Sequence, residues 1–384
     1  MVDSYFRAIN FGNGADMERR ITTKVDVGGV KIGGDAPVSI QSMCNTFTED
    51  IKATTDQIRA LSAAGCDICR CAVPNEKSAL ALGEIKLMLR AEGLLIPIVA
   101  DIHFDYKLAL ASIAAGADKI RINPGNIGNT ERVKTVTDAA GAAGIPIRIG
   151  VNSGSLENDV LERFGGPSSA ALAESALKNA EMIKKTGFSD LVVSIKSSNV
   201  NETLNAHRIF AANSDLPMHI GITEAGVGRS ALIKSAVGIG TLLTEGIGDT
   251  VRVSLTGDPV SEIPAARDIL RSVGMLPGAV ELISCPTCGR TKANLEVIAK
   301  EVSDAIESIE LLRKTNTHKM VDDKHITVAV MGCAVNGPGE ASHADLGVAC
   351  GEKNAVYFEN GEKVRTIEID EIVPTLIDGV KRLL

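Results

Sequence analysis

Short apolar segments alternate with helix-length segments along most of the chain, from about residue 38 to residue 274. The apolar segments are typical of buried parallel strands, and stretches such as 50–64 and 170–185 are typical of the helices between them. Eight such repeats in roughly 240 residues favour a closed (β/α)₈ barrel over a doubly wound open sheet. The predicted strands are Val38–Met43, Asp67–Val73, Ile96–Ile102, Ala117–Asn123, Ile145–Asn152, Asp190–Lys196, Met218–Thr223 and Asp249–Thr256.

The pattern differs on both sides of this repeat. Glycine pairs at 28–29 and 33–34 indicate turns, so we expect a hairpin or lid within residues 1–37 at the bottom of the barrel. After Pro277 the chain changes to a small α+β pattern. We therefore predict an α/β protein with a TIM-barrel domain at 1–276 and a smaller α+β domain at 277–384. The expected elements of the second domain are a helix from Leu295, strands at His325–Met331 and Leu346–Ala349, a hairpin at Asn360-Gly361 and a helix at Glu371–Leu384.

Composition and charge narrow the class of protein. A chain of 384 residues with 45% hydrophobic and 23% charged residues is folded rather than disordered. The net charge of −8 disfavours a partner that is nucleic acid or an anionic membrane. Neither a membrane-spanning run nor a signal-peptide pattern is present, which predicts a cytoplasmic protein. The eight cysteines would then stay reduced, and metal binding is favoured over disulfides.

Polar side chains occupy the carboxyl ends of the predicted strands, where barrel enzymes build their sites. Side chains alternate between the two faces of a strand, so Asn152 points into the mouth with the arginine four residues before it. Four arginines and a lysine on five strands predict a polyanionic ligand, such as a phosphate or diphosphate. These cations are Arg70, Arg121, Arg148, Lys196 and Arg252.

Three further polar residues share this mouth and are candidates for proton transfer: Asp101, His103 and Glu224. For Asp101, an equally good interpretation is that it only orients the arginines. Lys196 has an alternative role, because a lysine at the end of the sixth barrel strand can form a Schiff base in an aldolase. The excess of cations favours anion binding instead.

The second domain carries thiols at metal-ligand spacing. Cys285 and Cys288 form a Cys-x-x-Cys turn leading into a helix, which alone fits a zinc site or a redox dithiol as well. Cys333 lies in a glycine-rich segment that ends at Glu340, and glycines allow close packing around a bulky cluster. Thiolates are the usual ligands of iron–sulfur clusters. With three thiolates, the fourth ligand would be the carboxylate of Glu340, and Cys350 is the alternative.

The remaining cysteines are poor metal candidates. Cys66, Cys69 and Cys71 lie around the second barrel strand, where Arg70 faces the mouth and its two neighbours face the helices. We expect Cys44, near the end of the first strand, to line the mouth. A zinc site in the second domain stays open because of three nearby histidines: His318, His325 and His343.

Several longer motifs resemble the bacterial 4-hydroxy-3-methylbut-2-enyl diphosphate synthase family, in the same order from about residue 20 to the C-terminus. The motifs are Val-Ala-Asp-Ile-His-Phe-Asp at 99–105, Arg-Ile-Gly-Val-Asn-Ser-Gly-Ser-Leu at 148–156, Gly-Ile-Thr-Glu-Ala-Gly at 221–226, Cys-Pro-Thr-Cys-Gly-Arg at 285–290 and Gly-Cys-Ala-Val-Asn-Gly-Pro-Gly-Glu at 332–340.

The resemblance implies an activity in the non-mevalonate route to isoprenoids. The family converts 2-C-methyl-D-erythritol 2,4-cyclodiphosphate to hydroxymethylbutenyl diphosphate by two-electron reductive ring opening and dehydration. It implies a [4Fe–4S] cofactor, a flavodoxin or ferredoxin as electron donor, and a homodimer in which one cluster domain covers the partner's barrel. Cluster ligands would be Cys285, Cys288, Cys333 and Glu340.

Carried over by position, the resemblance also assigns the barrel residues. Glu224 would be the proton donor and Asp101 a residue of the same pocket, while Glu340 would be the ligand that substrate oxygen displaces. The diphosphate would be held by Arg70, His103, Arg121, Arg148, Asn152, Lys196, Thr223, Arg252 and Ser254.

Overall fold

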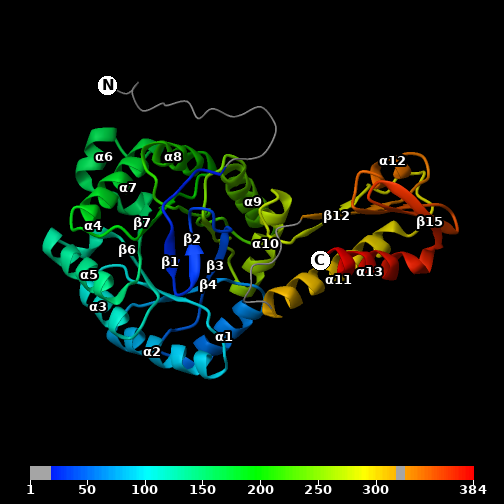
Figure 1. Ribbon diagram of the computed structural model, residues 1–384. Helices are drawn as coiled ribbons and strands as arrows, with labels where there is room; N and C mark the ends of the chain where they lie inside the picture. The colour runs from blue at the N-terminus through cyan, green and yellow to red at the C-terminus, as the bar shows by residue number, and fades with distance from the viewer. Residues whose placement is uncertain (1–18, 317–324) are drawn as a thin grey trace. The chain divides into compact units, whose positions relative to one another are not determined.

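The computed structural model describes residues 19–316 and 325–384, which form two compact units divided between Val273 and Gly274 (Figure 1). The first unit contains eight parallel strands in the spatial order β8-β7-β6-β5-β4-β3-β10-β9. A parallel bridge between Val193 and Met218 closes the ring, so the predicted barrel is confirmed. The strands are β3 (Ser39–Met43), β4 (Ile68–Ala72), β5 (Ile98–Asp101), β6 (Lys119–Ile122), β7 (Ile147–Asn152), β8 (Leu191–Lys196), β9 (His219–Ile220) and β10 (Thr250–Val251).

Helices surround the barrel strands, and side-chain caps begin many of them (Figure 1). Asp50, Asn75 and Ser168, for example, each accept a hydrogen bond from a backbone amide in the first turn of the following helix. The helices are α1 (Ile51–Ala63), α2 (Glu76–Ala91), α3 (Tyr106–Ala114), α4 (Pro124–Ile127), α5 (Thr130–Ala143), α6 (Asn158–Phe164), α7 (Ser169–Lys184), α8 (Val200–Asn213), α9 (Gly228–Thr244) and α10 (Glu262–Ser272).

A hairpin closes the amino-terminal end of the barrel, as the glycine pairs predicted. Strands β1 (Val25–Val27) and β2 (Val30–Ile32) pair in antiparallel fashion. Gly28 and Gly29, with φ of +57° and +99°, form the turn between them in the left-handed region that favours glycine. The apolar side chains of the hairpin pack against inward-facing residues of β4, β5 and β8, so the hairpin covers this end of the barrel. Residues 1–18, which the same prediction included, lie outside the described residues.

The second unit is a five-stranded mixed sheet with helices on both faces (Figure 1). β11, β12 and β13 are parallel neighbours, and β13, β14 and β15 are antiparallel neighbours. α11 and α13 pack on one face, and α12 packs on the other. The elements are β11 (Val280–Ser284), α11 (Leu295–Asn316), β12 (Ile326–Met331), α12 (Gly337–Ala341), β13 (Leu346–Cys350), β14 (Asn354–Glu359), β15 (Glu362–Glu368) and α13 (Ile372–Leu383).

Two predictions for the second unit were incomplete. The segment after β12, predicted as a glycine- and proline-rich loop, contains the short helix α12, because Pro338 lies in its first turn, where proline is well tolerated. Strand β11 was not predicted, and only its first residue is fully buried. None of the helices in the described ranges has the length and apolarity to cross a lipid bilayer.

Candidate functional site

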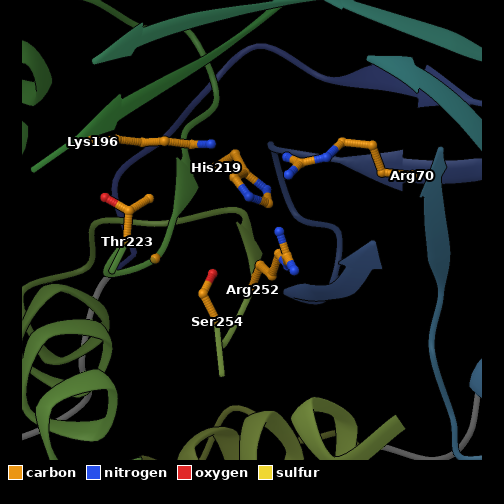
Figure 2. Close-up of a pocket in the computed structure, with 7 residues that line it drawn as sticks. Arg70, Lys196, His219, Thr223, Arg252 and Ser254 are labelled. Carbon is orange, nitrogen blue, oxygen red and sulfur yellow. The ribbon is translucent and has the colours of Figure 1, made fainter. Parts of the chain in front are cut away.

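A pocket opens at the carboxyl ends of the barrel strands, on the side opposite the hairpin (Figure 2). Figure 2 shows the side chains of Lys196 and Arg70 pointing toward His219 from opposite sides. Five of the residues predicted to bind the diphosphate line this pocket. The lining residues are Arg70, Lys196, His219, Gly221, Thr223, Arg252 and Ser254.

Two of the lining residues were not predicted. His219 lies four residues before Thr223, so the period-two alternation that selected the other residues would have found it had it been followed back along the strand. Gly221 lies between them, where a Cβ would come within 2.4 Å of the carbonyl oxygen of Arg252. Only glycine therefore allows β9 and the segment after β10 to approach this closely.

Asp101 is the buried anion that holds two of the cations. Its carboxylate lies 3.2 Å from Nη1 of Arg121, 3.7 Å from Nε of Arg70 and 3.6 Å from Nε2 of His103. Burial alone would raise the pKa of Asp101, but Arg70, the hydrogen bond from His103 and Arg121 hold it well below its usual range. The arrangement favours the orienting role for Asp101.

Arg252 is held by a carboxylate that the sequence did not single out. Glu262, 2% exposed, lies 3.1 Å from both Nε and Nη2 of Arg252 and also accepts a hydrogen bond from Ser42 Oγ at 2.8 Å. Met43 lies beside the same group, and its Sδ accepts from Nε of Arg70 at 3.0 Å. Glu262 begins helix α10 beyond a loop, so no strand pattern marks it as part of the mouth.

Arg148 and Arg121 are buried on the barrel strands and do not line the pocket. Arg148 is fully buried, and none of its three guanidinium nitrogens has a hydrogen-bond partner among the described residues. Arg121 crosses the strand position of Gly150, where a Cβ would lie 2.3 Å from its Nε. Glycine at this position lets the arginine reach across the barrel.

Asn152 and Glu224 complete the predicted barrel residues. Asn152 ends β7 directly beside Lys196 in the strand register. Glu224 follows Thr223 with an exposed side chain and a φ of +53°, a left-handed conformation that is uncommon for residues other than glycine. A carboxyl group on this exposed turn can exchange its proton with solvent.

In the second unit, two of the predicted cluster ligands follow neighbouring parallel strands. Cys285 comes directly after β11, and Cys333 comes two residues after β12. The backbone N–H of Gly332 donates to Cys285 Sγ at 3.2 Å. Parallel neighbours end at the same edge of a sheet, so both thiols belong to one edge.

The pKa of the Cys333 thiol lies below its usual value because backbone N–H groups of Asn336, Val335 and Gly337 donate to it. These amides lie at and before the start of α12. The expectation that the Cys-x-x-Cys turn leads directly into a helix was wrong: α11 begins at Leu295, as the helical spacing predicted, seven residues after Cys288. The backbone amides that favour a thiolate therefore donate to Cys333.

The other two predicted ligands, Cys288 and Glu340, are exposed. Within residues 19–316 and 325–384, no three Cys, His, Asp or Glu side chains converge closely enough to hold a metal ion. The donor set nevertheless fits an iron–sulfur cluster, because hydrogen bonds from backbone amides to cysteine sulfurs are characteristic surroundings of such clusters.

Cys350, the alternative fourth ligand, is fully buried in the core beneath α11 and α13. Burial, with a smaller effect of Cys285, raises the pKa of its thiol to about 11. A thiol that holds its proton this strongly is a poor metal ligand, which favours Glu340. Among the histidines that kept zinc open, His325 pairs with Glu281 at 3.1 Å, and His318 lies outside the described residues.

The four cysteines of the barrel are packed between strands and helices. Cys66, Cys69 and Cys71 are buried, and for Cys69 and Cys71 the alternation with Arg70 predicted this. The prediction that Cys44 lines the mouth was wrong: its side chain is 5% exposed, and its Sγ lies 3.9 Å from that of Cys71. Because Met43 takes the inward position beside Arg70, the next residue points outward.

Two features define the class of protein: the cation-lined pocket of the barrel and the thiols of the second sheet. They are those of a TIM-barrel enzyme with a site for a small anion. The chain belongs to the GcpE family. The GcpE TIM-barrel domain matches residues 22–267, and the GcpE protein C-terminal domain matches residues 281–382.

The curated relatives cover nearly the whole chain. The 4-hydroxy-3-methylbut-2-en-1-yl diphosphate synthase (flavodoxin) of Clostridium tetani is 50% identical over 367 residues, 96% of this chain and 100% of that one. The proteins of the same name from Caldanaerobacter subterraneus and Geobacter sulfurreducens are 50% and 49% identical, over 95% and 94% of this chain and 98% of theirs. These relatives confirm the resemblance and do not support the aldolase alternative.

The solved structures give a more distant likeness. Dihydropteroate synthase from Xanthomonas albilineans matches with a TM-score of 0.48 and 16% sequence identity, over 66% of this chain and 99% of that chain.

Proposed function

We propose that this chain converts 2-C-methyl-D-erythritol 2,4-cyclodiphosphate to (E)-4-hydroxy-3-methylbut-2-enyl diphosphate, as the names of its relatives suggest. The reaction consumes two electrons and one proton, opens the ring at a C–O bond and releases one water. The observation that carries the proposal is the cation-lined pocket at the carboxyl ends of the barrel strands. Its lining cations match the charge of a small diphosphate.

The diphosphate is bound by the cations of the mouth. Arg70, Lys196 and Arg252 line the pocket and donate charge-assisted hydrogen bonds to its oxygens, with Thr223 and Ser254 as neutral donors. Asp101 and Glu262 fix the directions of the guanidinium groups before the ligand arrives. Pre-set donors lose little conformational entropy on binding, so more of the interaction energy becomes affinity and orientation.

The deeper residues assigned by the resemblance complete the anion site. Arg121 and Arg148 add positive charge from below, and His103 and Asn152 stand at the ends of neighbouring strands. In a buried site this charge attracts the ligand strongly, because water does not screen it.

The redox chemistry requires a cofactor that the thiols of the second unit fit. A [4Fe–4S] cluster held by Cys285, Cys288, Cys333 and Glu340 supplies single electrons and a Lewis-acidic iron when bound. The amides around Cys333 stabilise its thiolate form. Glu340 would hold the remaining iron through a carboxylate, which is a more weakly held iron ligand than a thiolate, so this iron would supply the Lewis acidity.

Glu224 is the proton donor in this proposal. Its carboxyl gives the proton with which the hydroxyl group leaves as water, and it is recharged from solvent through its exposed position. Asp101 stays ionised and keeps Arg70 and Arg121 in place during the reaction.

The proposal extends to partners and location. The names of the relatives contain flavodoxin, which we propose as the electron donor, with ferredoxin as the alternative. We also propose a homodimer in the cytoplasm in which the second unit of one chain covers the barrel of the other, with no nucleic-acid or membrane partner.

The first test is the iron and acid-labile sulfide content of protein purified without oxygen. About four of each per chain are expected, together with turnover of the cyclodiphosphate when reduced flavodoxin is supplied. Zinc without sulfide would overturn the cluster and leave the Schiff-base aldolase with a structural zinc site, which borohydride would trap through Lys196. Iron and sulfide without turnover would overturn the substrate assignment alone.

A further inference from the structure

Five buried residues of the barrel strands carry side-chain nitrogen atoms without a hydrogen-bond partner in the part of the chain that the structure describes: Gln41, Lys119, Arg121, Arg148 and His219. Gln41 is an uncharged amide, and Arg121 pairs with Asp101 through its Nη1. We call the other three the inner group: Lys119 with its Nζ, Arg148 with all three guanidinium nitrogens, and His219 with its Nδ1. None of the three residues is more than 3% exposed. Buried polar groups nearly always have partners, so an unpaired group of this size requires an explanation.

The buried carboxylates of the mouth do not pair with the inner group. Asp101 lies between Arg70 and Arg121, and Glu262 binds Arg252 at two points. Both carboxylates therefore already pair with other cations, namely Arg70, Arg121 and Arg252. The described chain shows no ion pair for either cation of the inner group.

The inner group thus combines one permanent cation with two groups that can lose a proton. A guanidinium stays charged at every physiological pH, whereas an amine or an imidazole gives up its proton readily when buried. Burial, then Arg148 and Arg70, hold the pKa of Lys119 well below its ordinary value. These two neighbours are both cations, so nothing near Lys119 favours its charged form.

The same holds for His219, which connects the inner group to the pocket. Burial lowers its pKa, and positive charge on Arg148, Arg70, Lys119 or Lys196 lowers it further. Burial, then Arg70, Arg148 and Arg121, also hold the pKa of Lys196 well below its ordinary value, so only a comparison with a Lys119 variant assigns a proton to Lys119. Its ring lines the pocket, between Lys196 and Arg70 (Figure 2). An anion in the pocket therefore acts on a set of groups that already interact electrostatically.

We propose that Lys119 adjusts the charge of the barrel to its ligand: its amine is uncharged while the pocket is empty and takes up one proton from solvent when a diphosphate enters. This inference rests on the proposed diphosphate site. The charge of the anion, little screened in the buried interior, offsets the repulsion from Arg148 and Arg70 and favours the ammonium form.

The proposed reaction gives this proton a further use. Ring opening turns a cyclic diphosphate, a dianion, into a diphosphate monoester with up to three negative charges. A charged Lys119 balances the additional negative charge, while a neutral Lys119 keeps the empty barrel from accumulating repulsion. Lys119 is in this sense a positioning residue of the site, since it does not line the pocket.

Calorimetric titration with inorganic pyrophosphate in magnesium-free buffers tests the proposal. Titrations at one pH in buffers of different ionisation enthalpy give the number of protons exchanged on binding. Fixed cations alone would favour the fully deprotonated pyrophosphate and release protons, so net uptake by the wild type identifies a protein group. We expect the wild type to take up about one proton more per bound pyrophosphate than Lys119→Met.

The matched control is Lys134→Met, which removes an exposed lysine of α5 and should exchange protons as the wild type does. Equal proton numbers for the wild type and Lys119→Met would overturn the role of Lys119 and leave the diphosphate site standing. Absence of any binding heat in the wild type would overturn the diphosphate site, and this inference with it.

Thermal unfolding of the protein without ligand tests independently whether Lys119 is uncharged in the empty barrel. Methionine has nearly the shape of an uncharged lysine, so Lys119→Met should unfold at the wild-type temperature or above it. A lower unfolding temperature, or failure to fold, would mean that the amine is charged and paired in the empty protein, which contradicts the proposal. With pyrophosphate present, the wild type should gain more in unfolding temperature than the variant.

Discussion

The barrel and the second unit hold their candidate residues in opposite ways. Arg70 and Arg121 are buried on strands and already paired with Asp101. The thiol of Cys288 is exposed, and that of Cys333 is half-buried in a loop. Ion pairs within the barrel therefore hold the walls of the cation-lined pocket, whereas the candidate ligands of the second unit do not converge within the residues that the structure describes.

The difference reflects what each ligand needs. Unpaired guanidinium groups repel one another, so a pocket for a diphosphate persists only if carboxylates and strand geometry hold its walls apart. A metal cluster brings its own binding energy and can order the loops that ligate it, as structural metals do in small domains. We therefore expect the barrel site to tolerate loss of the cluster, and the thiol loops to depend on it.

The largest expected effect tests the thiol side of this comparison. Cys333→Ala should remove iron and labile sulfide and reduce turnover below detection, because it deletes the thiolate that the backbone amides favour. Pyrophosphate binding by the barrel should persist, measured by calorimetry on the same preparation. Loss of pyrophosphate binding together with the cluster would show that the two sites are not independent.

Cys350→Ala is the matched control. This cysteine is buried in the core of the second unit, and its pKa of about 11 keeps it a thiol. The variant should retain the iron content and the absorption spectrum of the wild type. Lost iron would make Cys350 the fourth ligand in place of Glu340.

The next effect concerns the proton. Glu224→Gln should reduce turnover by about 10²–10⁴-fold, the usual contribution of a general acid, while iron content and pyrophosphate affinity stay at wild-type values. The amide has nearly the same shape but cannot donate a proton of comparable acidity. Steady-state kinetics with the cyclodiphosphate distinguish proton donation from substrate binding. A change in KM with unaltered kcat would assign Glu224 to binding.

Two arginine variants break the comparison inside the barrel itself. Arg252→Met leaves Glu262 buried without its partner, so the free energy of unfolding should fall by about 2–4 kcal/mol. Arg148→Met removes a buried cation that has no partner in the described chain, so its stability should be unchanged or higher. Both should weaken pyrophosphate binding by about 10–100-fold. Urea unfolding and calorimetry give the two quantities; equal destabilisation by both variants would contradict the pairing described above.

The sequence predicted the barrel and its cations because both follow from simple periodicities. Eight apolar strands define the fold class, and alternation on each strand places Arg70, Arg121 and Arg148 inside. Cys44 was placed in the mouth by its position near the end of the first strand, and alternation from Met43, which pairs with Arg70, would have placed it on the outer face. The three arginines that the rule placed inside the barrel are buried in the structure.

Other features could not be predicted because they depend on contacts between distant segments. Glu262 reaches Arg252 from a helix beyond a loop, and the amides that serve Cys333 belong to a helix of five residues that has no periodic signal. Lys119 was visible in the sequence, but its lack of a partner is a property of the packed barrel. Local patterns made Glu224 a candidate for proton transfer and the cysteines candidate metal ligands, and the motif resemblance then gave them the roles of proton donor and cluster ligands.

The smallest expected effect is the pH dependence of the carboxylate that organises the pocket. Because Arg70, His103 and Arg121 hold the pKa of Asp101 below that of an unfolded aspartate, the folded state gains stability from it above about pH 4. This gain disappears as the pH falls from there through the pKa of the folded protein. Asp101→Asn should lower the free energy of unfolding by roughly 1–3 kcal/mol at pH 7, and the difference from the wild type should shrink at pH 3. Urea unfolding at both pH values measures the free energy of unfolding of each protein. The control is Asp138→Asn, which changes the exposed ion pair with Lys134. If the difference between the wild type and Asp101→Asn is the same at pH 7 and pH 3, Asp101 acts through packing and not through its charge.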